Sequence, residues 1–207
     1  MSESVLRHEL KFGLEGQKPN AVREFLMKSS FRTIHEDRVI CSVYLDTPDL
    51  RCFFETKEGL LPRSKFRFRW YGSRSLELSS ARVMRFEVKQ SLSHIRSKSV
   101  TETCVRNLGD FEISDGSYGH LGPVCAVSYR RSYMVRGTWR VTLDRDIAFH
   151  FITSQGISRG IDDPDKASVV EVKIGAGSDR DAVIESMPLP FTQFSKYERA
   201  MDFLSSE

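Results

Sequence analysis

The sequence predicts a β-dominated α+β fold, mainly because polar and apolar residues alternate with period two in eight segments. These are residues 4–12, 39–46, 65–71, 82–89, 98–103, 126–135, 139–147 and 169–174. Successive side chains of a strand point to opposite faces, so this pattern is typical of strands with one apolar and one polar face. Segments with helical spacing are few and short. We therefore expect an eight-stranded antiparallel sheet with short helices packed outside it.

Four short segments have helical character. Pro19–Lys28 begins with a proline and carries apolar residues at helical spacing. Residues 48–55 follow the second expected strand, residues 178–187 begin with a serine that can cap a helix, and a last helix begins near Lys196. The pair Arg136-Gly137 predicts a tight turn between the sixth and seventh strands.

Length and charge limit the function classes. The chain has 207 residues, which fits a single domain spanning 1–207. Its 31 Lys and Arg against 28 Asp and Glu give a formal net charge of +3. This balance does not suggest a general nucleic-acid binder, so we expect no nucleic-acid partner. Any functional basicity must come from where the charges lie.

Cysteine spacing and the N-terminus indicate the compartment. The four cysteines show no CxxC pair and no Cys/His cluster, which disfavours a zinc or redox site and fits a reducing environment. The first residues contain no apolar core of a signal peptide. No run approaches the roughly 20 apolar residues that cross a bilayer. We therefore expect a soluble cytoplasmic protein without a membrane span.

The polar phases of the expected strands are more basic than the chain as a whole. They carry ten basic residues, Arg7, Lys11, Lys65, Arg67, Arg69, Arg85, Lys89, Arg131, Arg140 and Lys173, and six acidic ones, Glu9, Asp46, Glu87, Asp144, Asp146 and Glu171. Neighbouring like charges repel and need a counter-ion or a ligand. A closed barrel with this phase inside would form a cationic channel that an anionic ligand makes favourable. The alternative is the ordinary solvated face of a half-buried antiparallel sheet.

The few carboxylates on these phases are candidate metal ligands. Hard oxygen donors suit Mg²⁺ or Mn²⁺, and such an ion could bridge a carboxylate to an anionic substrate. Glu171 and Glu9 are the first candidates, followed by Glu87 and Asp144. The alternative is that each carboxylate only pairs with a neighbouring Lys or Arg.

The order of several motifs resembles a known family. The segments RHELKF, VYLDTPDLRCFFE, KFRFRWYG, RFEVKQS, SYRRSY, VVEVKI and FSKYERA occur in this order over nearly the whole chain. They resemble the vacuolar transporter chaperone (VTC) domain, the polyphosphate polymerase branch of the CYTH-like triphosphate tunnel metalloenzymes. The resemblance implies an eight-stranded closed antiparallel β-barrel. It also implies metal-dependent transfer, with Mn²⁺ or Mg²⁺, of the terminal phosphoryl group of a nucleoside triphosphate such as ATP onto polyphosphate.

The resemblance also implies roles for individual residues. It places the catalytic contacts with the transferred phosphates on Arg67, Arg69, Lys89, Arg131, Arg140 and Lys196. It places further phosphate binding on Lys11 and Lys98, and the strand pattern adds Lys65, Lys173 and Arg7 to this group. It places the metal on Glu171. Two positions depart from the family pattern. Arg7 stands where the hydrolytic branch has its first Glu, which argues against a CYTH-type triphosphatase. Gln193 stands where the polymerase pattern has a basic residue.

Three other functions remain open from the sequence. Water could replace the acceptor phosphate, which would make the protein a tripolyphosphate or nucleotide hydrolase. The domain could bind polyphosphate without turnover. It could also be a structural β-domain with solvated charged faces. The preferred nucleotide and the oligomeric state are not readable from the residues.

Overall fold

The computed structural model describes residues 7–14, 16–72, 81–93, 95–163 and 165–206. The chain divides into two compact units. Unit 1 consists of Met1–Arg38, Tyr129–Ile147 and Asp162–Phe194, and unit 2 of Val39–Ser128, Ala148–Ile161 and Ser195–Glu207. The long strands β2, β7 and β8 contribute residues to both units.

The elements follow the expected order closely. The strands are β1 (Arg7–Gly13), β2 (Arg32–Asp46), β3 (Arg63–Tyr71), β4 (Arg82–Leu92), β5 (Ile95–Val105), β6 (Ile113–Asp115), β7 (Gly119–Arg136), β8 (Trp139–Thr153), β9 (Gly156–Ile157), β10 (Ile161–Asp162) and β11 (Val169–Gly175). The helices are α1 (Pro19–Lys28), α2 (Arg51–Lys57), the 3₁₀ helix η1 (Leu108–Phe111), α3 (Arg180–Glu185) and α4 (Lys196–Leu204). The longest described helix, α1, has 10 residues, about half of what a bilayer requires, and none of the described helices could span a membrane.

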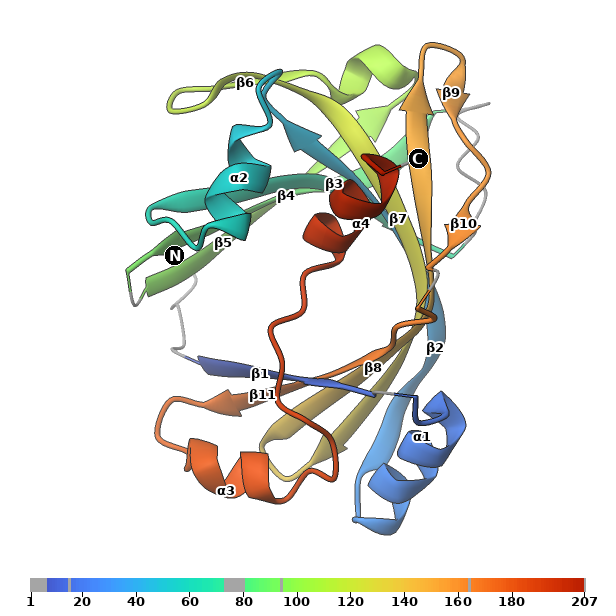
Figure 1. Ribbon diagram of the computed structural model, residues 1–207, viewed down its shortest axis with the longest axis vertical. Helices are drawn as coiled ribbons and strands as arrows, with labels where there is room; N and C mark the ends of the chain where they lie inside the picture. Colours follow the sequence, from blue (N-terminus) through green and yellow to red (C-terminus); the bar gives the residue numbers. More distant parts are fainter. Residues whose placement is uncertain (1–6, 15, 73–80, 94, 164, 207) are drawn as a thin grey trace. The chain divides into compact units, whose positions relative to one another are not determined.

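One sheet connects these strands (Figure 1). Its main path runs β1-β11-β8-β7-β2-β3-β4-β5, with the short strands β6, β9 and β10 off this path. The eight strands of the path are the eight that the alternation predicts, although residues 4–6 of the first lie outside the described chain. The path ends at β1 and β5, and no pairing joins these two strands in the described residues. The antiparallel, β-dominated fold is therefore confirmed, whereas closure into a barrel is not.

The apolar phases form the core of unit 1. Leu10 and Phe12 of β1 lie opposite Val172 and Val170 of β11, and all four are buried. Helix α1 adds Val22 and Leu26 to the same cluster, and α3 adds Val183. Both helices therefore cover the apolar face, as expected for an amphipathic helix that needs a surface to bury its apolar side.

Unit 2 has its own core on the apolar phase of β3. Phe66, Phe68 and Trp70 are at most 4% exposed and pack with residues from β2, β4 and β7. The ring of Phe68 contacts that of Phe111 in η1 edge to face, with centroids 5.1 Å apart. Lys65, Arg67 and Arg69 are thereby turned to the opposite face, because side chains alternate along a strand.

The prediction that all helices pack outside the sheet does not describe the attachment of helix α4. Its Tyr197 ring stacks on Tyr44, with centroids 4.9 Å apart and an interplanar angle of 19°. Tyr44 lies opposite Arg67 in the β2–β3 ladder and so belongs to the polar phase. The Tyr197 hydroxyl donates a hydrogen bond to buried Asp46 at the end of β2. Helix α4 is thus anchored on the charged face of unit 2.

Candidate site on the charged faces

A row of three lysines crosses the charged face of unit 2. Lys65 on β3 lies directly opposite Lys89 on β4, and Lys89 lies directly opposite Lys98 on β5. These strands lie side by side in the sheet (Figure 1). Directly opposed residues have Cβ atoms about 4.5–5.5 Å apart, and like charges in this relation destabilise a sheet. The row therefore favours a bound anion.

Next to this row, one buried carboxylate is surrounded by three cations. Glu87 on β4 accepts hydrogen bonds from Arg67 Nε at 2.7 Å and from Lys98 Nζ at 2.8 Å. Arg69 Nη1 lies 3.6 Å from the same carboxylate. The Glu87 side chain is only 4% exposed. Glu87 thus pairs with three cations of this face, beside which Lys65 and Lys89 add two further positive charges.

The cations determine the ionisation of Glu87. Burial by itself would raise the pKa of this carboxyl, but the nearby Arg67, Arg69 and Lys98 lower it from 4.5 to about 2. Burial lowers the pKa of Lys98, as do the two arginines, while Glu87 acts in the opposite direction. Glu87 is therefore ionised at neutral pH. The three cations around it favour a counter-ion role over the metal-ligand role that the sequence suggests.

The start of helix α4 brings further groups to this face. Lys65 Nζ donates to Ser195 Oγ at 3.0 Å, and Ser195 caps α4 by accepting from the backbone N–H of Glu198. Lys196 is the first residue of the helix. Arg67 donates to the Tyr44 hydroxyl at 3.4 Å. The Tyr44–Tyr197 stack thus joins the first turn of α4, where Lys196 lies, to Arg67 of β3 within unit 2.

Burial and the neighbouring Asp46 raise the pKa of Tyr197 far above its usual range. The hydroxyl therefore stays protonated and remains a donor to Asp46. The other oxygen of this carboxylate accepts from the backbone N–H groups of Thr47 and Cys52. Asp46 thus holds the beginning of α2 and the beginning of α4 together.

The charged face of unit 1 has a more even balance of acidic and basic side chains than that of unit 2. Lys173 Nζ on β11 lies 2.9 Å from Glu171 Oε1 and 4.0 Å from Glu9 Oε2. Lys11 Nζ lies 3.6 Å from Glu9 and donates to the carbonyl oxygen of Phe194 at 2.6 Å. Arg140 lies opposite Lys173 in the β11–β8 ladder and is exposed. Two carboxylates and three cations therefore meet on the neighbouring strands β1, β11 and β8.

The pKa of Glu171 lies well below its usual range. Burial would raise it, but the charges of Lys173, Arg131 and Lys11 outweigh this effect. Arg131 forms a bidentate pair with buried Asp144, at 2.5 Å and 2.7 Å. A bidentate guanidinium–carboxylate pair has fixed geometry, so Asp144 is engaged in the structure as described. Of the candidate metal ligands in unit 1, Glu171 and Glu9 are the better placed.

Oxygen atoms near Glu171 suit a hard divalent cation. Thr142 lies opposite Glu171 across β8 and β11, and its hydroxyl oxygen is buried without a hydrogen-bond partner in the described structure. Such an atom indicates a polar group still to be bound. No three His, Cys, Asp or Glu side chains converge on one point within the described residues. Mg²⁺ typically takes one or two protein carboxylates and completes its shell with water and phosphate oxygens, so the donors at Glu171 fit this type of ion.

The site residues expected from the sequence thus fall into two groups. Unit 2 contains Lys65, Arg67, Arg69, Glu87, Lys89, Lys98 and Lys196, and unit 1 contains Glu9, Lys11, Arg131, Arg140, Glu171 and Lys173. Arg7 lies in β1 opposite Gly175, but its side chain is outside the described part. Gln193 is exposed before α4. Sequence reasoning missed that Asp46 accepts from Tyr197, that Ser195 accepts from Lys65 and that Thr142 lies opposite Glu171, since each relation joins residues far apart in the chain.

Comparisons with known proteins give one family match and several similar solved structures. The family model described as VTC domain matches residues 6–111 and 102–205. A search of curated proteins gives no match. A proposed adenylate cyclase of Vibrio parahaemolyticus has a similar solved structure, with a TM-score of 0.54 and 15% identity over 94% of this chain and 97% of that one. A protein of Pyrococcus horikoshii has a similar structure with a TM-score of 0.52 and 14% identity, over 96% of this chain and 98% of that one. Another proposed adenylate cyclase, of Bacillus halodurans, has a TM-score of 0.52 and 11% identity, over 90% of this chain and 92% of that one. At these identities the likeness concerns the fold alone.

Proposed function

The chain belongs to the VTC domain family, and from this premise we propose that it is a polyphosphate polymerase-type phosphotransferase. It would move the terminal phosphoryl group of a nucleoside triphosphate, such as ATP, onto a polyphosphate chain. The proposal includes one domain over residues 1–207 and closure of the sheet into a tunnel. The observation that carries it is the row of Lys65, Lys89 and Lys98. Like charges directly opposite each other destabilise a sheet, and an anion bound beside them would offset this repulsion.

The charges of unit 2 suit a chain of phosphates rather than a single one. Arg67 and Arg69 present guanidinium groups that can hold phosphate oxygens in bidentate fashion, and the lysines supply point charges beside them. Glu87 pairs with Arg67, Arg69 and Lys98 among these five cations. Two-residue steps along a strand are about 7 Å apart, so the rows of Lys65 and Arg67 offer successive contacts to one extended polyanion.

Phosphoryl transfer needs positioning and charge neutralisation more than covalent chemistry from the protein. Arg67, Arg69, Lys89 and Lys196 would orient the phosphates, while Lys65 and Lys98 bind the chain. On unit 1, Lys11, Lys173, Arg131, Arg140 and Arg7 would give further phosphate contacts. Glu171, with Glu9 nearby, would hold Mg²⁺ or Mn²⁺, which supplies charge neutralisation when bound. Glu87 would keep Arg67 and Lys98 in place.

Two alternative functions differ from this proposal in their products. A hydrolase would release phosphate without making polymer, and Arg7 in place of the first family Glu speaks against that branch. A binding module would retain the polyanion without turnover. The carboxylates of Glu171 and Glu9, which both lie near Lys173 and could bind a metal, favour catalysis over binding alone.

Incubation of the purified protein with ATP and Mn²⁺ or Mg²⁺ tests the proposal. We expect polymer that grows with time on a gel, together with ADP. Release of orthophosphate without polymer would identify a hydrolase. Tight binding of tripolyphosphate with no ATP consumption would identify a binding module.

A further inference from the structure

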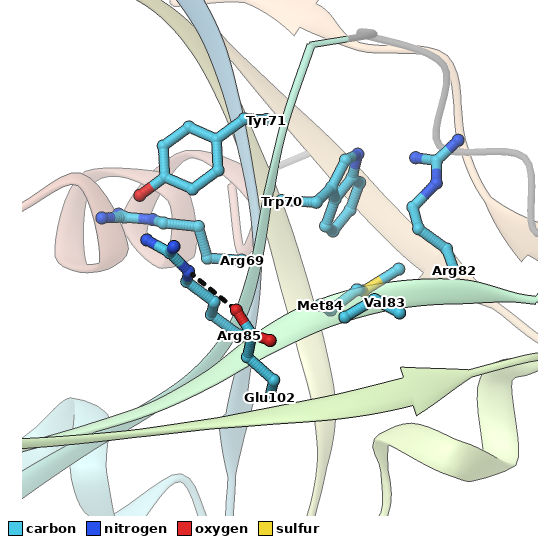
Figure 2. Close-up of a pocket in the computed structure, with 8 residues that line it drawn as sticks. All are labelled: Arg69, Trp70, Tyr71, Arg82, Val83, Met84, Arg85 and Glu102. Atoms are coloured by element: carbon cyan, nitrogen blue, oxygen red, sulfur yellow. Dashed lines mark ion pairs between the residues drawn. The ribbon is translucent and has the colours of Figure 1, made fainter.

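A pocket lies on unit 2 beyond the cations that we assign to phosphate. Its volume is about 370 Å³, within the range of small-molecule sites, and it lies where β3 ends and β4 begins. Figure 2 shows Arg69, Tyr71, Arg85 and Glu102 together on one side of β3, with Trp70 on the other. Tyr71, Arg85 and Glu102 have no place in the phosphate contacts proposed above.

One side of the pocket, formed by Arg69, Tyr71, Arg85 and Glu102, lies on the same face as the lysine row, further along the strands, while Trp70, Arg82 and Met84 line it from the other face. Across β3, β4 and β5, the first row is Lys65, Lys89 and Lys98, the next is Arg67, Glu87 and Val100, and the third is Arg69, Arg85 and Glu102. Because alternate residues of a strand share a face, Tyr71 follows Arg69 on this face. The face thus changes along its length from purely cationic to mixed aromatic and charged.

The third row suits a planar ligand better than another phosphate. Tyr71 is 40% exposed, and the Arg85 guanidinium carbon lies 5.5 Å from its ring centroid. Aromatic rings and guanidinium planes are the usual surfaces on which nucleobases stack. Glu102 lies 3.7 Å from Arg85 and is largely exposed. Its carboxylate would repel a phosphate but can accept a hydrogen bond from the amino group of a base.

Arg69 connects the pocket to the phosphate contacts. Its side chain is only 7% exposed and lies between Glu87, at 3.6 Å, and Ser42 Oγ, to which it donates at 3.1 Å. The same residue lines the pocket. A ligand that is aromatic at one end and polyanionic at the other would therefore match the face from Tyr71 to Lys65.

We propose that the pocket formed by Arg69, Tyr71, Arg85 and Glu102 binds the base of a nucleoside triphosphate. This assignment rests on the proposed function, because it takes the triphosphate to lie along Arg69, Arg67 and the lysine row. The base stacks on Tyr71 and Arg85, and Glu102 accepts from an exocyclic amine. The pocket sets the direction of the donor nucleotide on unit 2, and polyphosphate itself has no group to fill it.

Calorimetric titration with ATP and with inorganic tripolyphosphate separates the base from the phosphates. We expect Tyr71→Ala to weaken ATP binding five- to tenfold and to leave tripolyphosphate binding within twofold of wild type. Tyr71→Phe keeps the ring and should restore ATP affinity. Phe54→Ala, which removes a 51% exposed ring from α2 of the same unit, is the matched control and should change neither ligand.

Two results would overturn the base pocket while leaving the proposed function intact. Equal weakening of ATP and tripolyphosphate by Tyr71→Ala would mean that the pocket holds a phosphate. Unchanged ATP affinity would mean that the nucleotide does not use it. If the wild-type protein binds neither ligand, the proposed function fails and the pocket fails with it.

Discussion

Lys65 and Lys89 lie directly opposite each other across β3 and β4, and both belong to the charged face of unit 2. Lys98 extends the row onto β5. Lys98 donates a hydrogen bond to the Glu87 carboxylate at 2.8 Å, and Lys65 donates to Ser195 Oγ at 3.0 Å. An arrangement of this kind lowers the stability of the ligand-free protein and raises its affinity for polyanions.

Removal of one lysine from the row should separate these two effects. Lys89→Gln should stabilise the ligand-free protein by about 0.5 kcal/mol, because it relieves repulsion from two opposed lysines. The same change should reduce the rise in melting temperature on addition of tripolyphosphate, since ligand stabilisation follows affinity. Thermal unfolding with and without tripolyphosphate measures both. Lys18→Gln, at an exposed position before α1, is the control and should alter neither. A lower melting temperature of ligand-free Lys89→Gln would contradict the role of the row.

Glu87 should give the protein a specific dependence on acid. Its pKa of about 2 in the folded state lies below the ordinary value of 4.5, so the stability that it adds is complete above about pH 4.5 and is lost as pH falls toward 2. This shift corresponds to about 3 kcal/mol. Glu87→Gln should therefore be less stable than wild type by up to that amount at pH 7.

Urea unfolding at several pH values checks this expectation. The difference between wild type and Glu87→Gln should shrink steadily between pH 4.5 and pH 2. Glu112→Gln, at an exposed position after η1, provides the comparison. A difference that stays constant down to pH 2 would show that the loss of Glu87 acts through packing and not through charge.

The hydroxyl of Tyr197 should contribute to the attachment of α4. Tyr197→Phe removes one hydrogen bond to the buried Asp46 carboxylate, and we expect a loss of about 2 kcal/mol from the free energy of unfolding. Tyr71→Phe removes a hydroxyl from a ring that is 40% exposed and should change stability by less than about 0.5 kcal/mol. Chemical denaturation of both variants measures the two effects. Equal stability of Tyr197→Phe and wild type would mean that the stack on Tyr44 alone holds the helix.

Substitution of Glu171 should affect metal dependence more than phosphate binding. Glu171→Gln keeps the size of the side chain and removes its charge, so we expect at least a hundredfold lower rate of ATP consumption with Mn²⁺. Tripolyphosphate should still bind in the absence of metal. Glu185→Gln, exposed on α3 of the same unit, is the matched control. Full activity of Glu171→Gln would exclude this residue as the metal ligand.

The local parts of the fold could be predicted from the sequence, since they depend on neighbouring residues. Helix α1 has the predicted bounds Pro19–Lys28 because a proline starts it and apolar residues at helical spacing bury one side. The alternation in β3 correctly separates Phe66 and Phe68 from Arg67. The same alternation puts His8 on the apolar phase of β1 with Leu10 and Phe12, yet His8 is exposed because it lies near the beginning of the strand.

Relations between distant residues could not be predicted in this way. Each strand revealed its basic phase, but the register that sets Lys65, Lys89 and Lys98 in one row arises from pairing between strands. The helical spacing of Tyr197 and Met201 puts both on one face of α4, but it carries no sign that Tyr197 stacks on Tyr44 of a charged face. The position of Thr142 opposite Glu171 could not be predicted either, because it depends on the pairing of β8 with β11.

Direct titration of tripolyphosphate into the protein tests most closely whether the lysine row is a polyphosphate site. Wild type should bind, with an affinity that falls as salt is added, because the contacts are charge pairs. The triple variant Lys65→Gln, Lys89→Gln, Lys98→Gln, checked by circular dichroism for an intact fold, should bind at least tenfold more weakly. Equal affinity of the folded triple variant and wild type would contradict the account.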